Sequence, residues 1–405
     1  MNLLFLTLLD FDSINEHNIY TDLLREFCNH GHKVYVISPI ERRSGKQPRI
    51  IHGKNSTILK LRIGNTQKTN IIEKGISTVT LESIFIRGIK RYFSDVKFDL
   101  LMYSTPPITF QRAVEYVKRR DAAKTYLLLK DIFPQNAVDI GMLSKNGWKG
   151  LIYKYFRKKE KRLYEISDHI GCMSEANCKY ILKHNPEINP EKVEVCPNCI
   201  EVQDMSLTLE ERNNMRNKYG IPLDKIVFVY GGNLGKPQGI PFLVACLKTQ
   251  MKNEQAFFLI VGDGTEFNVL AAFFEKYKPK NMKLMKRLPK DDYDRMIAAC
   301  DVGMIFLDHR FTIPNFPSRL LSYMQAKLPV LAVTDPNTDI GEIIIESEFG
   351  LWCESDDLQR FNKIIKETIK ADLKTMGKNG SKYLEENYNS AKGYEIIRKV
   401  YNKQT

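Results

Sequence analysis

The sequence predicts an α/β protein built from two doubly wound domains that face a central cleft. Short apolar runs alternate with amphipathic helical segments from end to end, which is the pattern of parallel sheets covered by helices. The same alternation begins again after a polar stretch at residues 201–219. A chain of 405 residues is also too long for one hydrophobic core, so two domains are expected.

The predicted strands of the first domain are mostly continuous apolar runs, as in strands that are buried on both faces. They cover residues 2–9, 33–38, 57–63, 98–104, 124–129, 169–173 and 193–196. Helical patterns between them cover residues 14–29, 108–120, 147–166 and 175–184. The polar segment 64–80 has poor periodicity and is expected to be a mobile loop.

The second domain repeats this plan. Its predicted strands cover residues 226–230, 256–261, 282–285, 302–307 and 330–333, and residues 356–402 carry helical patterns only. We place the linker near residues 199–208. The predicted domains are residues 1–200 and 201–385, with residues 386–405 as a C-terminal helix that returns to the first domain.

Composition excludes several classes of protein. Hydrophobic residues make up 43% of the chain, which excludes a disordered protein, and no apolar run approaches the length of a bilayer-spanning helix. The apolar run 1–9 has no basic flank and meets Asp10 and Asp12 at once, so it is interpreted as a strand rather than a signal peptide. The protein is therefore expected in the cytoplasm.

The net charge of +13 lies almost entirely in the first half of the chain. Residues 1–200 hold 32 basic and 21 acidic residues, or +11, and the remainder holds 29 and 27, or +2. A basic domain of this kind indicates an anionic partner, such as nucleic acid, anionic lipid or a phosphorylated substrate.

The eight cysteines are expected to be reduced. Cys196 and Cys199 have CxxC spacing, but no second such pair or paired histidine completes a zinc site. They are interpreted as two free thiols, and no metal site is predicted.

Ligands of open α/β sheets bind beyond the carboxyl ends of the strands, so the strand-to-helix turns are the candidate sites. The turn 230–239 holds four glycines and Lys236, which indicates phosphate binding, although a structural turn is the alternative. The turn at Gly262 is of ordinary Asp-Gly type. Pro317, Ser318 and Arg319 open a predicted helix and form a candidate anion site.

Two segments of the first domain are also notable. Lys130 and Asp131 follow a buried strand and either face the cleft or form a surface salt pair. Residues 148–162 carry apolar and aromatic residues at helical spacing and seven basic residues. That segment is either a helix for an anionic membrane surface or a solvated helix packed on its own domain.

These turns, in this order, resemble glycosyltransferase family 4 of the GT-B fold over nearly the whole chain. The likeness is greatest to sugar transferases of bacterial capsule and O-antigen assembly. The pieces that carry it are residues 31–36, 130–134, 231–235, 261–264, 317–319, 323–324 and 329–330.

The resemblance implies two Rossmann-like domains and a retaining, metal-independent hexosyl- or acetamidosugar-transferase of surface polysaccharide synthesis. The donor would be a nucleotide-sugar, with UDP or GDP as the nucleotide, and we predict UDP. The acceptor would be a lipid-diphosphate-linked saccharide. No cofactor is expected. By the resemblance the catalytic residues are Lys130, Asp131 and Lys236. The donor-binding residues are Gly231, Gly232, Asn233, Gly235, Lys236, Gly262, Arg287, Leu288, Pro317, Ser318, Arg319 and Ser322.

The sequence departs from the family pattern in three places. Pro314 and Ser322 occupy positions where many members have a pair of glutamates. Residues 12–15 replace a glycine pair, and Lys130 stands where many members have histidine. The resemblance therefore assigns no general base, and in a front-face mechanism the departing phosphate oxygen can take the acceptor proton.

The expected partners are the nucleotide-sugar, the lipid-linked acceptor and the anionic inner face of the plasma membrane, where the protein would be peripheral. One alternative is a basic two-domain nucleic-acid-binding protein, but the sequence has no helix-turn-helix, RNP-like or zinc motif. The other is a nucleotide-sugar epimerase of the same plan, which would need acid–base pairs of carboxylates and histidines.

Overall fold

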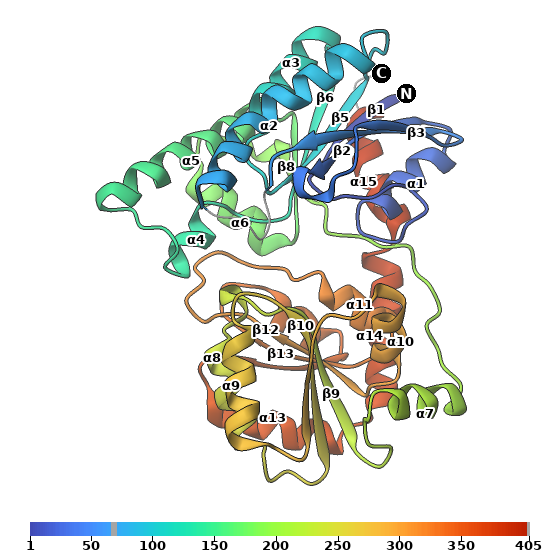
Figure 1. The fold of residues 1–405 in the computed structure, drawn as a ribbon, viewed down its shortest axis with the longest axis vertical. Helices are drawn as coiled ribbons and strands as arrows, with labels where there is room; N and C mark the ends of the chain where they lie inside the picture. The colour runs from blue at the N-terminus through green and yellow to red at the C-terminus, as the bar shows by residue number, and fades with distance from the viewer. Residues whose placement is uncertain (66–70, 403–405) are drawn as a thin grey trace. The chain divides into compact units, whose positions relative to one another are not determined.

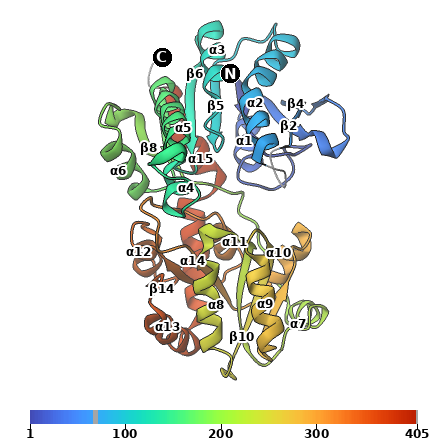
Figure 2. The same cartoon turned by 60° about the vertical axis from the view of Figure 1, so that its left-hand side comes forward.

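The computed structural model describes residues 1–65 and 71–402 as two compact units, and each is an α/β domain with a parallel sheet. The first unit comprises residues 1–201 and 389–405, and the second comprises residues 202–388. Figures 1 and 2 show the sheet and helices of each unit. The predicted α/β class is confirmed, whereas the predicted cleft concerns the placement of the units and stays a prediction.

The first unit contains an eight-stranded sheet in the order β3-β4-β2-β1-β5-β6-β7-β8. All neighbours are parallel except β3, which pairs with β4 as an antiparallel hairpin. The strands are β1 (Asn2–Leu6), β2 (Lys33–Glu41), β3 (Arg49–His52), β4 (Ser56–Ile63), β5 (Leu100–Thr105), β6 (Lys124–Leu129), β7 (His169–Cys172) and β8 (Val193–Val195). The helices are α1 (Thr21–Asn29), α2 (Ile71–Tyr92), α3 (Gln111–Asp121), α4 (Gln135–Asp139), α5 (Gly147–Ile166), α6 (Glu175–His184) and α15 (Ser390–Asn402), with 3-10 turns Arg42–Ser44 and Pro190–Lys192.

Helices cover both faces of this sheet, which explains the continuous apolar strands. One face packs on α1 and α15, and Phe27 of α1 meets Tyr394 of α15 with ring centroids 4.9 Å apart. On the other face α2 packs against β4 and α3, with the ring of Phe85 5.2 Å from that of Phe110. α15 thus completes the core of the first unit.

The second unit contains a six-stranded parallel sheet in the order β11-β10-β9-β12-β13-β14. The strands are β9 (Ile226–Asn233), β10 (Ala256–Asp263), β11 (Met282–Met285), β12 (Val302–Phe306), β13 (Val330–Thr334) and β14 (Gly350–Glu354). The helices are α7 (Leu209–Lys218), α8 (Ile240–Thr249), α9 (Phe267–Tyr277), α10 (Lys290–Ala298), α11 (Arg319–Gln325), α12 (Ile340–Glu346), α13 (Leu358–Lys370) and α14 (Leu373–Asn387), with a 3-10 turn η3 (Lys236–Gln238). Its core is formed by the apolar strands with α8, α9 and α13.

Three sequence predictions of local structure are wrong. The predicted helix 14–29 begins only at Thr21, because the Asn18 side chain accepts hydrogen bonds from the backbone N–H groups of Tyr20 and Thr21 and holds the preceding residues in a turn. Of the predicted loop 64–80, residues 71–80 belong to α2, whose C-terminal half is anchored by Leu81 and Phe85; residues 66–70 lie outside the described residues. The short strands β3 and β14 were not predicted.

All eight cysteines are buried and free, as the sequence predicts. No helix among the described residues is both long enough and apolar enough to span a membrane.

Candidate functional site

The candidate donor site lies at the carboxyl edge of the second sheet. Because its strands are parallel, the segments that follow β11, β10, β9 and β12 all leave the sheet at this edge. Arg287 and Leu288 follow β11, and Gly262 is the penultimate residue of β10. Gly231 to Asn233 end β9, and Gly235 lies just beyond it. Pro317, Ser318 and Arg319 lie between β12 and β13. The fold therefore gathers residues from four distant parts of the sequence at one edge.

Two of the glycines predicted as a turn, Gly231 and Gly232, lie in the last part of β9, which pairs with β10. Gly232 pairs with Gly262, and a Cβ on Gly262 would lie 1.9 Å from the carbonyl oxygen of Gly232. Gly232 itself has a φ of +120°, which a side chain would strain. Gly262 thus allows close backbone packing, and Gly232 allows the chain to bend at the sheet edge.

Most backbone N–H groups of this segment are already bonded within the domain. The N–H of Gly231 donates to the Tyr323 hydroxyl at 3.1 Å, and that of Leu234 to the Asp263 carbonyl at 3.0 Å. The N–H of Gly235 donates to Oε1 of Gln238 at 3.1 Å. Cationic side chains are therefore the main groups left to meet a phosphate here.

Arg319 is the most unusual of these cations. Its guanidinium carbon lies 4.4 Å from the centroid of the Tyr230 ring, and Nη2 would lie 3.4 Å from a Cβ on Gly232. The residue is half-buried, and its Nη1 is buried without a hydrogen-bond partner among the described residues. A buried cationic donor that lacks a partner is costly, and it is the feature expected of an anion site.

Tyrosines hold Arg319 in place, and the sequence analysis missed them. The Tyr323 hydroxyl contacts the carbonyl oxygens of Val229 and Met304 at 3.3 and 3.2 Å, which locks α11 to β9 and β12. The Tyr293 hydroxyl lies so near Gly231 that a Cβ there would approach it to 1.9 Å. A tyrosine four residues after an arginine on a short helix is the signal that could have indicated this support.

The other predicted donor residues take different positions. Lys236 is exposed at the start of η3 and has no ion-pair partner among the described residues, and Arg287 is exposed beyond β11. The η3 segment is tied to the end of β12, because the N–H of Asp308 donates to the Pro237 carbonyl at 3.0 Å. The remaining residues all lie at the same edge of the sheet. Gly232 and Asn233 are exposed, and Gly231 and Gly235 are buried. The half-buried residues are Leu288, Pro317, Ser318 and Ser322.

The Lys130–Asp131 pair of the first unit follows β6. The Lys130 ammonium donates to the Cys196 carbonyl at 3.2 Å, and burial lowers its pKa. Each oxygen of the Asp131 carboxylate accepts a hydrogen bond from the Asn136 amide at 2.8 Å. Burial raises the pKa of Asp131 to about 6. Asp131 is thus a carboxyl group that can exchange a proton near neutral pH.

The loop that follows β1 is fixed by a buried lysine that the sequence analysis missed. Lys60 of β4 is fully buried, and its ammonium bonds Asp10, the Phe11 carbonyl at 2.9 Å and the Ser38 hydroxyl at 2.9 Å. Burial tends to raise the pKa of Asp12, but the positive charges of Lys60 and Arg49 lower it by more. The pKa of Asp12 therefore lies below its ordinary value. The signal was a lysine between two leucines, Leu59 and Leu61, within a predicted strand.

A pocket of about 460 Å³ adjoins this loop within the first unit. It lies between the loop, α1 and the β3–β4 hairpin, and carboxylate, amide and guanidinium groups line it beside isoleucine side chains. Such a lining suits the hydroxyl groups of a saccharide. The residues that line it include Asp12, Ser13, Asn15, Arg25, Asn29 and Lys54.

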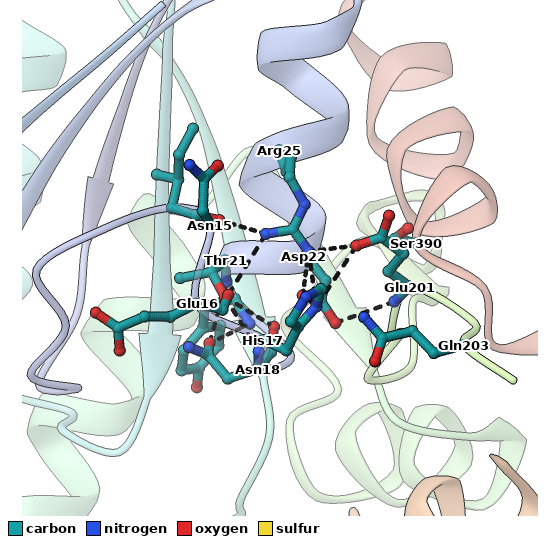
Figure 3. Close-up of polar contacts among 12 residues, drawn as sticks. Asn15, Glu16, His17, Asn18, Thr21, Asp22, Arg25, Glu201, Gln203 and Ser390 are labelled. Atoms are coloured by element: carbon teal, nitrogen blue, oxygen red, sulfur yellow. Dashed lines mark hydrogen bonds and ion pairs between the residues drawn. The ribbon is translucent and has the colours of Figure 1, made fainter. Parts of the chain in front are cut away.

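One group of possible metal ligands occurs among the described residues, formed by His17, Asp22 and Glu201 (Figure 3). The Arg25 guanidinium lies 2.6 Å from a carboxylate oxygen of both Asp22 and Glu201. Because the Arg25 guanidinium already bonds both carboxylates, the group is an ion-pair cluster, and it ties the segment after β8 to α1.

Comparison with known proteins finds similarity to glycosyltransferases. Residues 211–383 match the model of the family described as Glycosyl transferases group 1. The protein named "Probable glycosyltransferase WbjE" of Pseudomonas aeruginosa is 24% identical over 325 residues, which cover 80% of this chain and 78% of that protein.

Two solved structures illustrate the likeness of fold. WaaG, a glycosyltransferase involved in lipopolysaccharide biosynthesis, has a TM-score of 0.66 at 14% identity, covering 98% of this chain and 99% of that one. Alr3699/HepE of Anabaena, solved in complex with UDP and glucose, has a TM-score of 0.68 at 13% identity, covering 99% of each chain. The chain thus has the α/β fold of the two-domain GT-B glycosyltransferases, and its residues 211–383 are similar to the Glycosyl transferases group 1 family.

Proposed function

We propose that this protein is a retaining glycosyltransferase that moves a hexosyl or acetamidosugar unit from a UDP-sugar to a lipid-diphosphate-linked saccharide. It would act in surface polysaccharide synthesis at the inner face of the plasma membrane. The similarity to glycosyltransferases supports the reaction class, and the UDP complex of the HepE structure supports the choice of donor. The basic first unit, which holds most of the net charge of +13, suits a diphosphate acceptor among anionic lipids.

The observation that carries the proposal is the guanidinium of Arg319 at the edge of the second sheet. Its buried Nη1 lacks a partner, and its Nη2 lies against Gly232. A diphosphate beside Gly232 would supply that partner, and the planar guanidinium can bond two phosphate oxygens at once. Lys236 would add a second, mobile cation from η3.

The chemistry follows from those charges. The bond between the sugar C1 and the diphosphate oxygen breaks, and the acceptor oxygen forms its bond to C1 on the same face of the ring. The acceptor hydroxyl gives its proton to the departing phosphate oxygen. Arg319 and Lys236 would stabilise the charge that develops on the diphosphate, the role that a metal ion fills in other transferases.

The remaining predicted residues take supporting roles in this proposal. Arg287 and Leu288, beyond β11, would flank the nucleoside, and Pro317, Ser318 and Ser322 would border the sugar. In the first unit Asp131 would orient the acceptor hydroxyl, with Lys130 as its cationic neighbour. The pocket beside Asp12 would hold part of the acceptor saccharide.

Calorimetric titration with UDP, GDP and ADP tests the donor site directly. We expect UDP to bind with the highest affinity, and a panel of UDP-sugars should then show slow hydrolysis of one member in the absence of acceptor. Retention of configuration is read by NMR from the anomer formed with that donor. Equal or absent binding of the three diphosphates would contradict the proposed donor site, and an inverted product would contradict the proposed mechanism.

A further inference from the structure

Large apolar side chains are exposed together on α5 and in the turn before it. Trp148 is 70% exposed, Leu151 69% and Tyr155 48%, and their spacing of three and four residues places them on one face of the helix. Met142, in the preceding turn, is 56% exposed. These are four of the twelve large hydrophobic side chains that are exposed in the described part of the chain, so the cluster is not the usual scatter of single residues.

Lysines surround this apolar stripe. Lys145, Lys149, Lys154 and Lys158 form no ion pair with any described residue, and no acidic residue occurs between residues 140 and 159. The ammonium groups of Lys145 and Lys149 lie 5.6 and 5.9 Å from the ring centroids of Tyr153 and Trp148. The stripe and its charges therefore share one surface.

The opposite face of α5 is used by the domain itself. The Phe156 ring meets Phe133 at 5.1 Å, and Leu163 and Tyr164 are buried. Arg157 bonds the Glu160 carboxylate and the Asn185 amide oxygen, each at 2.6 Å. Figure 2 shows α5 within the first unit, together with α4 and α6. Because this inner face already anchors the helix, packing within the unit does not account for the exposed stripe.

We propose that this surface, formed by Met142, Lys145, Trp148, Lys149, Leu151, Lys154, Tyr155 and Lys158, docks the first unit on an anionic bilayer. Trp148 and Leu151 would enter the boundary between headgroups and acyl chains, and the lysines would meet lipid phosphates. Apolar residues on one face with unpaired cations beside them are the chemistry of an interfacial helix. This proposal rests on the proposed function in one respect only, which is that the reaction takes place at a membrane.

Co-sedimentation of the full chain with vesicles measures this docking. The vesicles contain phosphatidylcholine alone or with 30% phosphatidylglycerol, at low and at physiological salt. We expect binding to the anionic vesicles only, weaker at higher salt. W148S/L151S should lower the affinity at least about tenfold, and K149Q/K154Q/K158Q by roughly a hundredfold at low salt.

Matched controls come from the second unit. Leu209 is 72% exposed, and the side chains of Lys363 and Lys382 are 70% and 75% exposed, each with a glutamate carboxylate 3.9 Å away. L209S and K363Q/K382Q therefore remove an exposed apolar group and two exposed charges outside the proposed surface. Both controls should bind vesicles like the parent protein. All variants should keep their circular dichroism and their affinity for UDP, which separates a failure of this surface from a failure of the donor site.

Fluorescence gives an independent readout, because the chain holds only two tryptophans, Trp148 and Trp352. In W352F the emission of Trp148 should shift to shorter wavelength with anionic vesicles and stay unchanged with neutral ones. Binding that the α5 variants leave intact, or an emission maximum that does not move, would overturn the proposal. A third outcome would also overturn it: a parent protein that does not bind vesicles but forms a dimer, which W148S/L151S dissociates. The surface would then bind a second copy of the chain.

Discussion

Replacing Arg319 with methionine tests the donor site most directly. The substitution keeps an unbranched side chain beneath Gly232 but removes the guanidinium that stacks on Tyr230. No carboxylate of the described residues pairs with Arg319, so the change leaves no acidic partner behind. We therefore expect the variant to fold and to lose affinity for UDP.

The structure also sets the size of the effect. A hydrogen bond from a cation to a phosphate oxygen contributes about 1.5–3 kcal/mol, which corresponds to a 10- to 150-fold rise in Kd. R319K keeps the charge but not the planar pair of donors, so its Kd should rise about tenfold. Because the buried Nη1 has no partner in the free protein, R319M should leave the Tm unchanged or raise it by a few degrees.

Arg216 provides the matched control, since it is a fully partnered buried arginine of the same unit. Its side chain is 1% exposed and bonds Asp301 at 2.6 Å and the Ala299 carbonyl at 2.8 Å. R216M should lower the free energy of unfolding by about 3–5 kcal/mol, because Asp301 and the carbonyls of Ala299, Pro222 and Lys225 all lose the buried guanidinium. Calorimetry with UDP and urea unfolding measure both quantities. The reasoning is refuted if R319M binds UDP within twofold of the parent, or is destabilised as much as R216M.

Three further predictions follow from the same geometry. G262A should lower the free energy of unfolding by about 3 kcal/mol and weaken UDP binding, because the new Cβ would clash with the Gly232 carbonyl oxygen. Urea unfolding like that of the parent protein would contradict this prediction. K60M should lower the free energy of unfolding by about 2 kcal/mol, because the buried Ser38 hydroxyl and Phe11 carbonyl lose a partner while Asp10 can be hydrated. An unchanged midpoint of urea unfolding would contradict this expectation. Burial raises the pKa of Asp131 from 3.8 to about 6, so the folded state binds its proton more tightly and stability falls as pH rises through this range. D131N should gain up to about 3 kcal/mol relative to the parent between pH 4 and pH 7, and a difference that does not depend on pH would contradict the shift.

Segments with a clear apolar or amphipathic pattern were predicted most accurately. The predicted bounds of α5, α6, β6 and β11 agree with the structure, because an uninterrupted apolar or amphipathic pattern sets their ends. α1 was predicted seven residues too long, because the start of this helix depends on hydrogen bonds to the Asn18 side chain rather than on periodicity. The strand β3 depends on pairing with β4, and no four-residue segment specifies such a pairing by itself.

The candidate site was only partly visible in the sequence. Glycines and cations at strand ends are local features, and they brought Gly232, Gly262 and Arg319 into the prediction. The support of Arg319 is only partly local: Tyr323 lies four residues on in the same helix, whereas Tyr230 lies on β9, 89 residues away in the sequence. Pairing of that kind becomes visible only when the fold places the elements side by side.

The glycines of the second unit meet two different demands, and the distinction bears on how the site would hold an anion. Gly262 makes space for the backbone of the neighbouring strand, whereas Gly232 bends the chain beneath a guanidinium. Since the N–H groups of Gly231 and Gly235 are bonded within the unit, the segment offers few backbone donors to a phosphate. Affinity would then come chiefly from side-chain charge, which is sensitive to salt and is lost when one residue is neutralised. For that reason Arg319, rather than the glycine segment that first indicated phosphate binding, is the residue on which the proposed function depends.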